Sequence, residues 1–266
     1  MPNTRIPVVL VHGLWLHATS WQPWAERFAD EGYEPVMPAW PGEPDTVEEA
    51  RAHPEAQAGV GVEAISAACA AVIGKLPESP VLVGHSMGGF VVQHLLGQGI
   101  GRAAVAISPG QIKGVKALSA TQGKAVFPIL RNRRNAERAV SLTPEQFRFG
   151  FANAVSEEES AALHDKWSMP SPARPLFELA LANLHRDSPG KVATGNEERG
   201  PLLLLSGKLD HTIPDVLTRS THKQYRRSAA VTEYQRFDDR GHSLIVDSGW
   251  PAVADTALAW LRRNLP

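Results

Sequence analysis

Six short runs of aliphatic and β-branched residues recur along the chain, and longer stretches with helical spacing of apolar positions separate them. The runs predict strands at Val8–Val11, Glu34–Met37, Pro80–Val83, Ala103–Ile107, Leu202–Ser206 and Val231–Phe237. The intervening patterns predict helices that include Trp21–Asp30, Val62–Leu76, Gly89–Leu96 and Ala252–Asn264. Strands that alternate with helices form a mostly parallel sheet flanked by crossover helices. The sequence therefore predicts an α/β fold.

The interval between the fourth and fifth predicted strands is too long for a plain loop. Residues 111–197 contain helical stretches, such as Thr143–Ala154 and Ser156–Trp167, which are punctuated by prolines and show no strand pattern. A connection of this length inside one sheet needs structure of its own. We therefore predict a core formed by residues 1–110 and 198–266, with residues 111–197 inserted as a helical cap over one edge of the sheet.

The third predicted strand runs into Gly84-His85-Ser86-Met87-Gly88, and a helical pattern follows directly. A G-x-S-x-G motif between a strand and a helix is typical of a nucleophilic serine, because the strained turn brings the flanking positions too close to backbone for a side chain. The turn also places the serine hydroxyl near a helix N-terminus, where N–H groups favour developing negative charge. Ser86 is therefore the candidate nucleophile.

A serine hydroxyl becomes a good nucleophile when an imidazole accepts its proton and a carboxylate orients that imidazole. In this architecture the acid and the histidine follow the serine in that order. Asp210 follows the fifth predicted strand in the segment GKLDHTIP, and His242 lies in the glycine loop DDRGHSL after the last predicted strand. The sequence predicts a catalytic triad of Ser86, Asp210 and His242.

Other histidines and acids compete for these roles. His211 adjoins Asp210 in the chain, so that carboxylate is poorly placed to orient it, and His222 falls in a polar, helix-like stretch. Three further carboxylates lie near His242, where turn and capping roles are their simpler interpretation: Asp238, Asp239 and Asp247.

Acyl transfer also needs backbone donors for the oxyanion that forms on the attacked carbonyl. The N–H of Met87, which follows the nucleophile, is one candidate. The N–H of Leu14, in the HGLW loop after the first predicted strand, is the other. His12 in the same loop is interpreted as a residue that braces the loop by hydrogen bonding.

The motifs occur in the order VLVHGLW, ATSW, GYEPVMPAWPG, VGHSMGG, LLLLSGKLDHTIP and RGHSL. With these motifs the chain resembles the α/β-hydrolase superfamily over nearly its full length. The resemblance implies the α/β-hydrolase fold and a triad of Ser86, Asp210 and His242. One loop departs from the family pattern. The family often has Asp-x-Pro-Gly-x-Gly after the second strand, whereas residues 39–44 read AWPGEP, which leaves the shape of this loop open.

The function expected is hydrolysis of a carboxylic ester, or of a lactone or thioester, through an acyl-enzyme on Ser86. Two alternatives remain on the same fold, because a fold does not fix a reaction: a cofactor-independent lyase or oxygenase, and a low-turnover small-molecule-binding or receptor protein. Hydroxynitrile lyases, which the chain resembles in the first-strand loop and the triad, have Thr in place of Gly13 and Lys in place of Ser243. Haloalkane dehalogenases and epoxide hydrolases have Asp where this chain has Ser86.

Composition narrows the partners. The chain has 266 residues, of which 43% are hydrophobic and 21% charged, and a formal net charge of −1, which is ordinary globular composition without a basic surplus for nucleic acid or an anionic membrane. Its single cysteine, Cys69, excludes an intrachain disulfide, and the ten histidines show no paired ligand spacing. We therefore expect no metal and no cofactor, and a small-molecule substrate as the partner, while the oligomeric state stays open.

The N-terminal residues lack the pattern of a signal peptide, because the apolar run Ile6–Val11 ends at His12-Gly13. No apolar run approaches the roughly 18 residues that a membrane span requires. We expect a cytoplasmic protein without a membrane partner.

Overall fold

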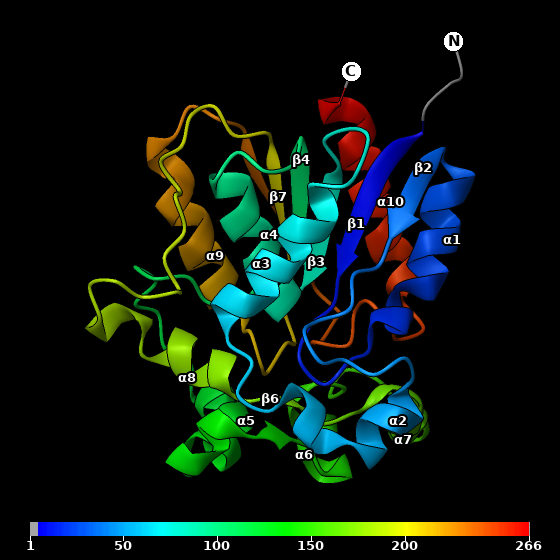
Figure 1. Ribbon diagram of the computed structural model, residues 1–266, viewed down its shortest axis with the longest axis vertical. Helices are drawn as coiled ribbons and strands as arrows, with labels where there is room; N and C mark the ends of the chain where they lie inside the picture. Colours follow the sequence, from blue (N-terminus) through cyan, green and yellow to red (C-terminus); the bar gives the residue numbers. More distant parts are fainter. Residues whose placement is uncertain (1–4, 266) are drawn as a thin grey trace.

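The computed structural model describes residues 5–265 and contains a six-stranded sheet in the order β2-β1-β3-β4-β7-β8, drawn in Figure 1. Every neighbouring pair of strands in this sheet is parallel. The strands are β1 Ile6–Val11, β2 Tyr33–Val36, β3 Val81–His85, β4 Ala103–Ile107, β7 Leu202–Gly207 and β8 Thr232–Phe237. The α/β prediction is therefore confirmed, and each predicted strand lies within two residues of an observed one.

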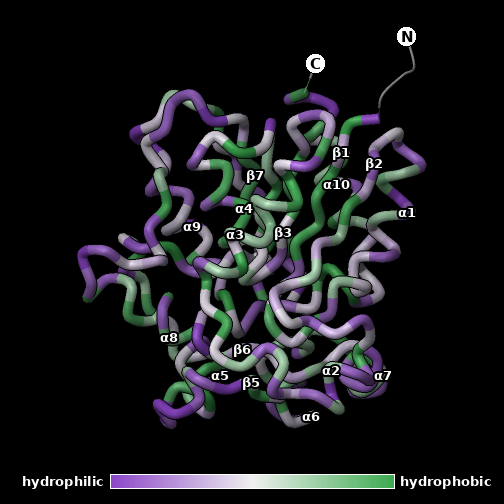
Figure 2. Tube along the Cα trace, viewed as in Figure 1, coloured by the Kyte–Doolittle hydropathy of each residue, from purple (hydrophilic) through white to green (hydrophobic). Residues whose placement is uncertain are grey.

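The burial of each strand follows its place in the sheet. β3, β4 and β7 lie in the interior of the sheet and are buried at every residue, which explains their unbroken aliphatic runs. β8 lies at the edge and keeps polar residues such as Glu233 and Gln235 on an exposed side. Figure 2 shows hydrophobic residues concentrated on the central strands and hydrophilic residues on the outer turns.

Helices cover both faces of the sheet (Figure 1). α1 and α10 pack against each other, as do α3 and α4, while α9 packs on β7 and β8. Their bounds are α1 Gln22–Asp30, α3 Val62–Ile73, α4 Met87–Gly97, α9 Asp215–Gln224 and α10 Trp250–Asn264. A 3₁₀ turn, η1 (Ala18–Trp21), precedes α1, and η5 (Tyr225–Arg227) follows α9. The longest of these helices has 15 residues, and within residues 5–265 none is long and apolar enough to cross a bilayer.

The chain between β4 and β7 forms most of a second layer, which lies at the lower end of the view in Figure 1. Its elements are α5 Ala120–Leu130, η3 Arg133–Glu137, β5 Ala139–Val140, α6 Pro144–Gly150, α7 Glu157–Trp167, β6 Ser171–Pro172, α8 Arg174–Ala180 and η4 Ala182–Leu184. α2 (Val47–Ala52) and η2 (Pro54–Gln57), which follow β2, lie beside them. We refer to residues 111–197 as the cap; its bounds stay a prediction.

The expectation of a strand-free cap is wrong. β5 and β6 pair in antiparallel fashion, with Ala139 opposite Pro172 and Val140 opposite Ser171. Each strand has two residues, too few for a sequence periodicity, and they come together only when the cap folds. The predicted helix Thr143–Ala154 is also shorter than expected, because α6 ends at Gly150.

Candidate active site

Ser86 lies in a sharp turn between β3 and α4. Its backbone φ is 55° and ψ is −116°, a strained conformation for a residue with a side chain. A Cβ on Gly84 would lie 2.2 Å from the carbonyl oxygen of Gly88, and a Cβ on Gly88 would lie 2.1 Å from the carbonyl oxygen of Val11. Both positions therefore require glycine, which is the steric reason for the G-x-S-x-G pattern.

The structure brings Ser86, His242 and Asp210 together at the carboxyl ends of the strands. The Nε2 atom of His242 lies 3.0 Å from Oγ of Ser86, and its Nδ1 atom lies 2.7 Å from Oδ2 of Asp210. Because a carboxylate accepts hydrogen bonds, Nδ1 carries the hydrogen, and Nε2 is left to accept from the serine hydroxyl. All three residues are buried, with Ser86 8% exposed at the pocket.

Asp210 is held in place by its own turn. Its Oδ1 atom accepts hydrogen bonds from the backbone N–H groups of Thr212 at 2.8 Å and Ile213 at 2.7 Å. Those bonds leave Oδ2 directed at His242. The adjacent His211 points elsewhere, with Nδ1 2.9 Å from the carbonyl oxygen of Phe149.

The competing acids have other partners. Asp238 binds Arg236 and Asp239 binds Arg240, both near the surface. Asp247 is buried and accepts from the Ser243 hydroxyl at 2.7 Å, and burial raises the pKa of its carboxyl. Neither of the two histidines that sequence reasoning set aside touches Ser86, and the Nε2 atom of His222 lies 3.3 Å from a β8 carbonyl oxygen.

His85 contacts the loop that carries His242, and the G-x-S-x-G motif alone does not predict this contact. Its Nε2–H donates to the backbone carbonyl of His242 at 3.0 Å, and the two rings lie 4.6 Å apart between centroids. Burial, reinforced by the nearby His242, holds the pKa of His85 well below its usual range. His85 is therefore a neutral donor that fixes the loop carrying His242.

Leu14 and Met87 line the same pocket as Ser86. In the part of the chain that the structure describes, neither backbone N–H donates to another residue. Both groups are therefore available to a substrate oxygen. A Cβ on Gly13 would lie 2.8 Å from Cβ of Ser86, so the loop that carries Leu14 approaches the serine as closely as glycine permits.

A buried carboxylate braces this loop from behind. Glu43 has a fully buried side chain, and its Oε2 atom lies 2.8 Å from Nε2 of His12. The other oxygen accepts from the backbone N–H of Ala18 at 2.9 Å, and Oε2 also accepts from the N–H of Trp40 at 3.1 Å. Burial acts to raise the pKa of Glu43, but His12 and these N–H groups outweigh it, so the pKa lies below its usual value.

Glu43 occupies the loop that departs from the family pattern, and sequence reasoning missed it. The signal was an acid in an otherwise apolar segment, AWPGEP. The bracing role expected of His12 agrees with the Glu43 contact and with a 2.9 Å contact between its Nδ1 and the Gly13 carbonyl oxygen. The ring of His12 also stacks on Trp40 at 4.3 Å.

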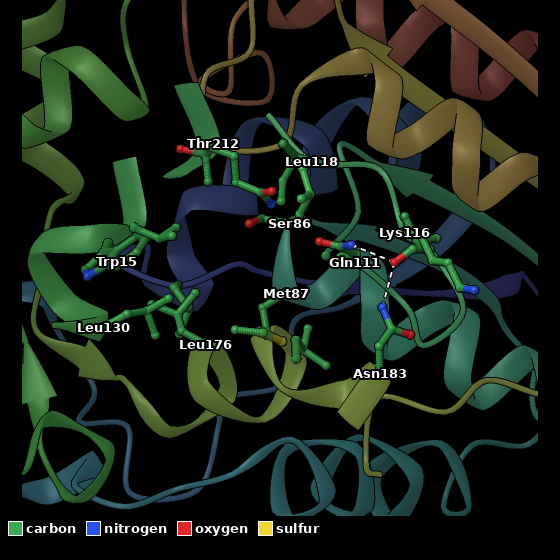
Figure 3. Close-up of a pocket in the computed structure, with 18 residues that line it drawn as sticks. Trp15, Ser86, Met87, Gln111, Lys116, Leu118, Leu130, Leu176, Asn183 and Thr212 are labelled. Carbon is green, nitrogen blue, oxygen red and sulfur yellow. Dashed lines mark hydrogen bonds between the residues drawn. The ribbon is translucent and has the colours of Figure 1, made fainter. Parts of the chain in front are cut away.

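The pocket in front of Ser86 has a volume of about 360 Å³ (Figure 3). In this view Trp15, Leu130 and Leu176 lie on one side of the serine, and Gln111 and other polar side chains lie on the opposite side. Most of the wall is apolar and comes from the cap. The pocket therefore offers an apolar chamber beside the serine hydroxyl.

Trp15 lines the pocket, whereas Trp40 and Trp167 do not. Trp167 packs against the small cluster that contains Val47 and Met169, and also against the main hydrophobic core. The sequence did not predict that α5 lines the pocket, because a proline at position 128 is typical of a helix end. In the structure the helix continues through Pro128. The signal available was the four-residue spacing of the lining residues Gln122, Val126 and Leu130.

Within residues 5–265 no group of three or more His, Cys, Asp or Glu side chains is arranged to hold a metal ion.

The match to a family model settles the class of protein. The model of the alpha/beta hydrolase family matches residues 8–256, so the chain belongs to this family. No curated protein sequence matches the chain significantly.

Solved structures of the same fold are numerous, and the following three are distant from this chain in sequence. A monoacylglycerol lipase from Paleococcus ferrophilus is 21% identical with a TM-score of 0.66, over 96% of this chain and 93% of that one. An extracellular α/β-hydrolase from a Paenibacillus species is 19% identical with a TM-score of 0.70, over 96% and 98%. The Arabidopsis methylesterase MES16 is 16% identical with a TM-score of 0.65, over 97% and 99%. At these identities the likeness shows the fold.

Proposed function

We propose that this protein is a serine hydrolase that cleaves a carboxylic ester through an acyl-enzyme on Ser86. The observation that carries the proposal is the continuous chain of hydrogen bonds from Ser86 through His242 to Asp210, which opens onto an apolar pocket. The lipase and methylesterase of the same fold described above support the same reaction class.

In the proposed reaction Oγ of Ser86 attacks the ester carbonyl while Nε2 of His242 takes the hydroxyl proton. The electron pair of the carbonyl moves onto its oxygen, where the N–H groups of Leu14 and Met87 stabilise the charge. The C–O bond then breaks, and the imidazolium gives its proton to the leaving alcohol. Water repeats the sequence on the acyl-enzyme and releases the acid, with Asp210 stabilising the imidazolium at each stage.

The shape of the pocket supports esters with an apolar acyl or alcohol part. Its volume of about 360 Å³ is in the range of small-molecule sites, and its wall is mostly aliphatic. Lactones and thioesters present the same electrophilic carbonyl and remain within the proposed class.

A lyase reaction has less support. Hydroxynitrile lyases of this fold have a threonine where this chain has Gly13, and a Cβ there would lie 2.8 Å from Cβ of Ser86. They also have a lysine at the position of Ser243, which here is buried and donates its hydroxyl to Asp247. We expect no cyanide release from mandelonitrile above the uncatalysed rate.

The proposal is tested with a fluorophosphonate probe and a p-nitrophenyl ester panel. The probe is expected to mark the peptide that contains Ser86, and Ser86→Ala is expected to lower kcat by about 10³ or more. Labelling of another serine, or full activity of Ser86→Ala, would refute the assignment. A protein that binds esters tightly without turnover would favour the receptor alternative.

A further inference from the structure

Trp15, the residue after Leu14, has an unusual backbone. Its φ is 64°, in the left-handed region that a bulky residue rarely adopts. The residue is buried, and it lines the pocket beside Ser86. A tryptophan keeps this conformation only where surrounding groups hold it there.

The groups that hold Trp15 belong to the cap. Its backbone N–H donates to Oγ of Ser171 at 2.6 Å, and its indole Nε1–H donates to the carbonyl of Val140 at 3.1 Å. Its carbonyl accepts from the N–H of Met169 at 3.2 Å. Ser171 and Val140 are directly opposed partners in the β5–β6 pair, which we call the cap ribbon. The cap ribbon therefore accepts hydrogen bonds from both the backbone and the side chain of Trp15.

We propose that the cap ribbon holds the oxyanion loop in its catalytic conformation, and that Ser171 is a positioning residue for acyl transfer. The inference rests on the proposed function. Leu14 supplies the proposed oxyanion donor and shares a peptide unit with Trp15. That shared unit carries the Leu14 carbonyl and the Trp15 N–H, and it is joined at the Cα of Leu14 to the preceding unit, which carries the Leu14 N–H. A change of Trp15 toward an ordinary negative φ turns the shared unit and displaces the Cα of Leu14, which shifts the Leu14 N–H away from the substrate carbonyl oxygen. The cap then contributes to turnover as well as to substrate selection.

Ser171 is the residue on which this arrangement depends most. It is 1% exposed, and its hydroxyl oxygen is the acceptor for the Trp15 N–H. Without that oxygen the buried N–H of Trp15 loses its hydrogen-bond partner. The loop then lowers its free energy by moving to a conformation in which this N–H finds another partner. Ser171 does not line the pocket, so its replacement leaves the contacts of a bound substrate in place.

The test compares Ser171→Ala with the matched control Ser168→Ala. Ser168 lies in the same cap segment and is also buried, but within residues 5–265 its hydroxyl makes no hydrogen bond. For p-nitrophenyl butyrate, Ser171→Ala is expected to lower kcat by about 10-fold or more and to keep KM within about threefold. Ser168→Ala is expected to keep both constants within about twofold of wild type.

A boronic acid gives a second readout. Butylboronic acid forms a tetrahedral adduct on an active serine and so needs the oxyanion donors. Its inhibition constant is expected to rise in Ser171→Ala by about the factor by which kcat falls. A residue with a purely structural role would lower thermal stability without this parallel change.

Further variants keep the inference testable if Ser171→Ala fails to fold. Ser171→Cys preserves the size with a weaker acceptor and is expected to be intermediate in kcat. Trp15→Phe removes the indole hydrogen bond to Val140 together with part of the pocket wall, so kcat alone is used for this variant and is expected to fall. Unchanged kcat in these variants, a rise in KM alone, or an equal loss in Ser168→Ala would overturn the inference.

The two proposals fail in different ways. A wild-type protein that is not labelled at Ser86 and hydrolyses no ester refutes the proposed function. An active wild type whose Ser86→Ala variant is inactive, together with a fully active Ser171→Ala, refutes only the role of the cap ribbon.

Discussion

At the scale of single residues, each group in the site has a neighbour that limits its freedom. Asp210 directs one carboxylate oxygen at His242 because two backbone N–H groups hold the other. The loop that carries His242 is in turn fixed by the neutral His85. A site built in this way holds its candidate catalytic groups in place before a substrate binds, which would reduce the reorganisation needed during the proposed reaction.

The first prediction concerns the choice of acid. Asp210→Asn is expected to fold normally and to lower kcat by up to about 10⁴, because an amide favours the wrong tautomer of His242. The exposed Asp239, which binds Arg240, supplies the control Asp239→Asn, with unchanged kcat expected. Steady-state kinetics on one ester measures both. A crippled Asp239→Asn beside an active Asp210→Asn would contradict the assignment.

The second prediction concerns Glu43 and pH. Its pKa in the folded protein lies below the ordinary value for a glutamate, so its contribution to stability is complete above that ordinary value and is lost as the pH falls through the lower, folded pKa. Glu43→Gln is expected to lower the free energy of unfolding at pH 7 by about 1.5–3 kcal/mol. The difference from wild type should shrink as the pH drops below the unfolded pKa.

Urea unfolding at several pH values measures this difference. The exposed Glu63 on α3 supplies the control Glu63→Gln, for which no comparable loss is expected. If the free energy of unfolding of Glu43→Gln lies below that of wild type by the same amount from pH 7 to pH 3, then packing, and not charge, explains the effect of Glu43.

At the scale of elements, the site forms where loops from β1, β3, β7 and β8 meet at one edge of the sheet. Parallel strands place their carboxyl ends together, so segments far apart in sequence converge there. α5 then covers this edge with one face, on which Gln122, Val126 and Leu130 line the pocket. Phe127 on the same helix lies outside the pocket and is 62% exposed. Among the residues of α5, only those that face the pocket should therefore affect substrate selectivity.

The third prediction follows from that asymmetry. Val126→Trp is expected to narrow the pocket and to lower kcat/KM for p-nitrophenyl octanoate relative to the acetate by about 10-fold or more. Phe127→Trp on the same helix, outside the pocket, should leave this ratio unchanged. Equal effects of the two substitutions would place the acyl chain elsewhere.

At the scale of the whole molecule, one hydrophobic core joins both faces of the sheet to the cap. Core residues come from the strands and from helices on each side, and cap residues such as Phe147 and Phe151 pack into the same cluster. Phe147 is fully buried and stacks on Phe151, so it belongs to this core and not to the pocket wall. A core that is continuous in this way favours cooperative unfolding.

The fourth prediction uses Cys69 as a reporter of that cooperativity. The thiol is fully buried in α3, and burial raises its pKa to about 12, so it is expected to resist Ellman's reagent until the protein unfolds. Glu63→Cys adds an exposed thiol on the same helix as a positive control. Labelling of Cys69 in the native protein as fast as that of the control would show that α3 opens independently.

Much of the fold, and the meeting of Ser86, Asp210 and His242 at one place, could be predicted from the sequence because the signals are local. Buried parallel strands need unbroken aliphatic runs, and the elbow at Ser86 needs glycines two residues to each side, whatever the rest of the chain does. Asp210 and His242 were found because each follows a strand, and strand ends share one edge. Because the acid and the histidine must follow the serine in that order, each after a strand, few other acids and histidines qualify.

What only the tertiary structure decided are the contacts between segments without a local pattern. Trp15 and Ser171 are 156 residues apart, and Glu43 reaches His12 from a loop whose sequence departs from the family. The cap ribbon is too short for periodicity, and α5 continues past Pro128. Such contacts form because buried polar groups need hydrogen-bond partners, which can come from any part of the chain. No short window of the sequence contains both partners.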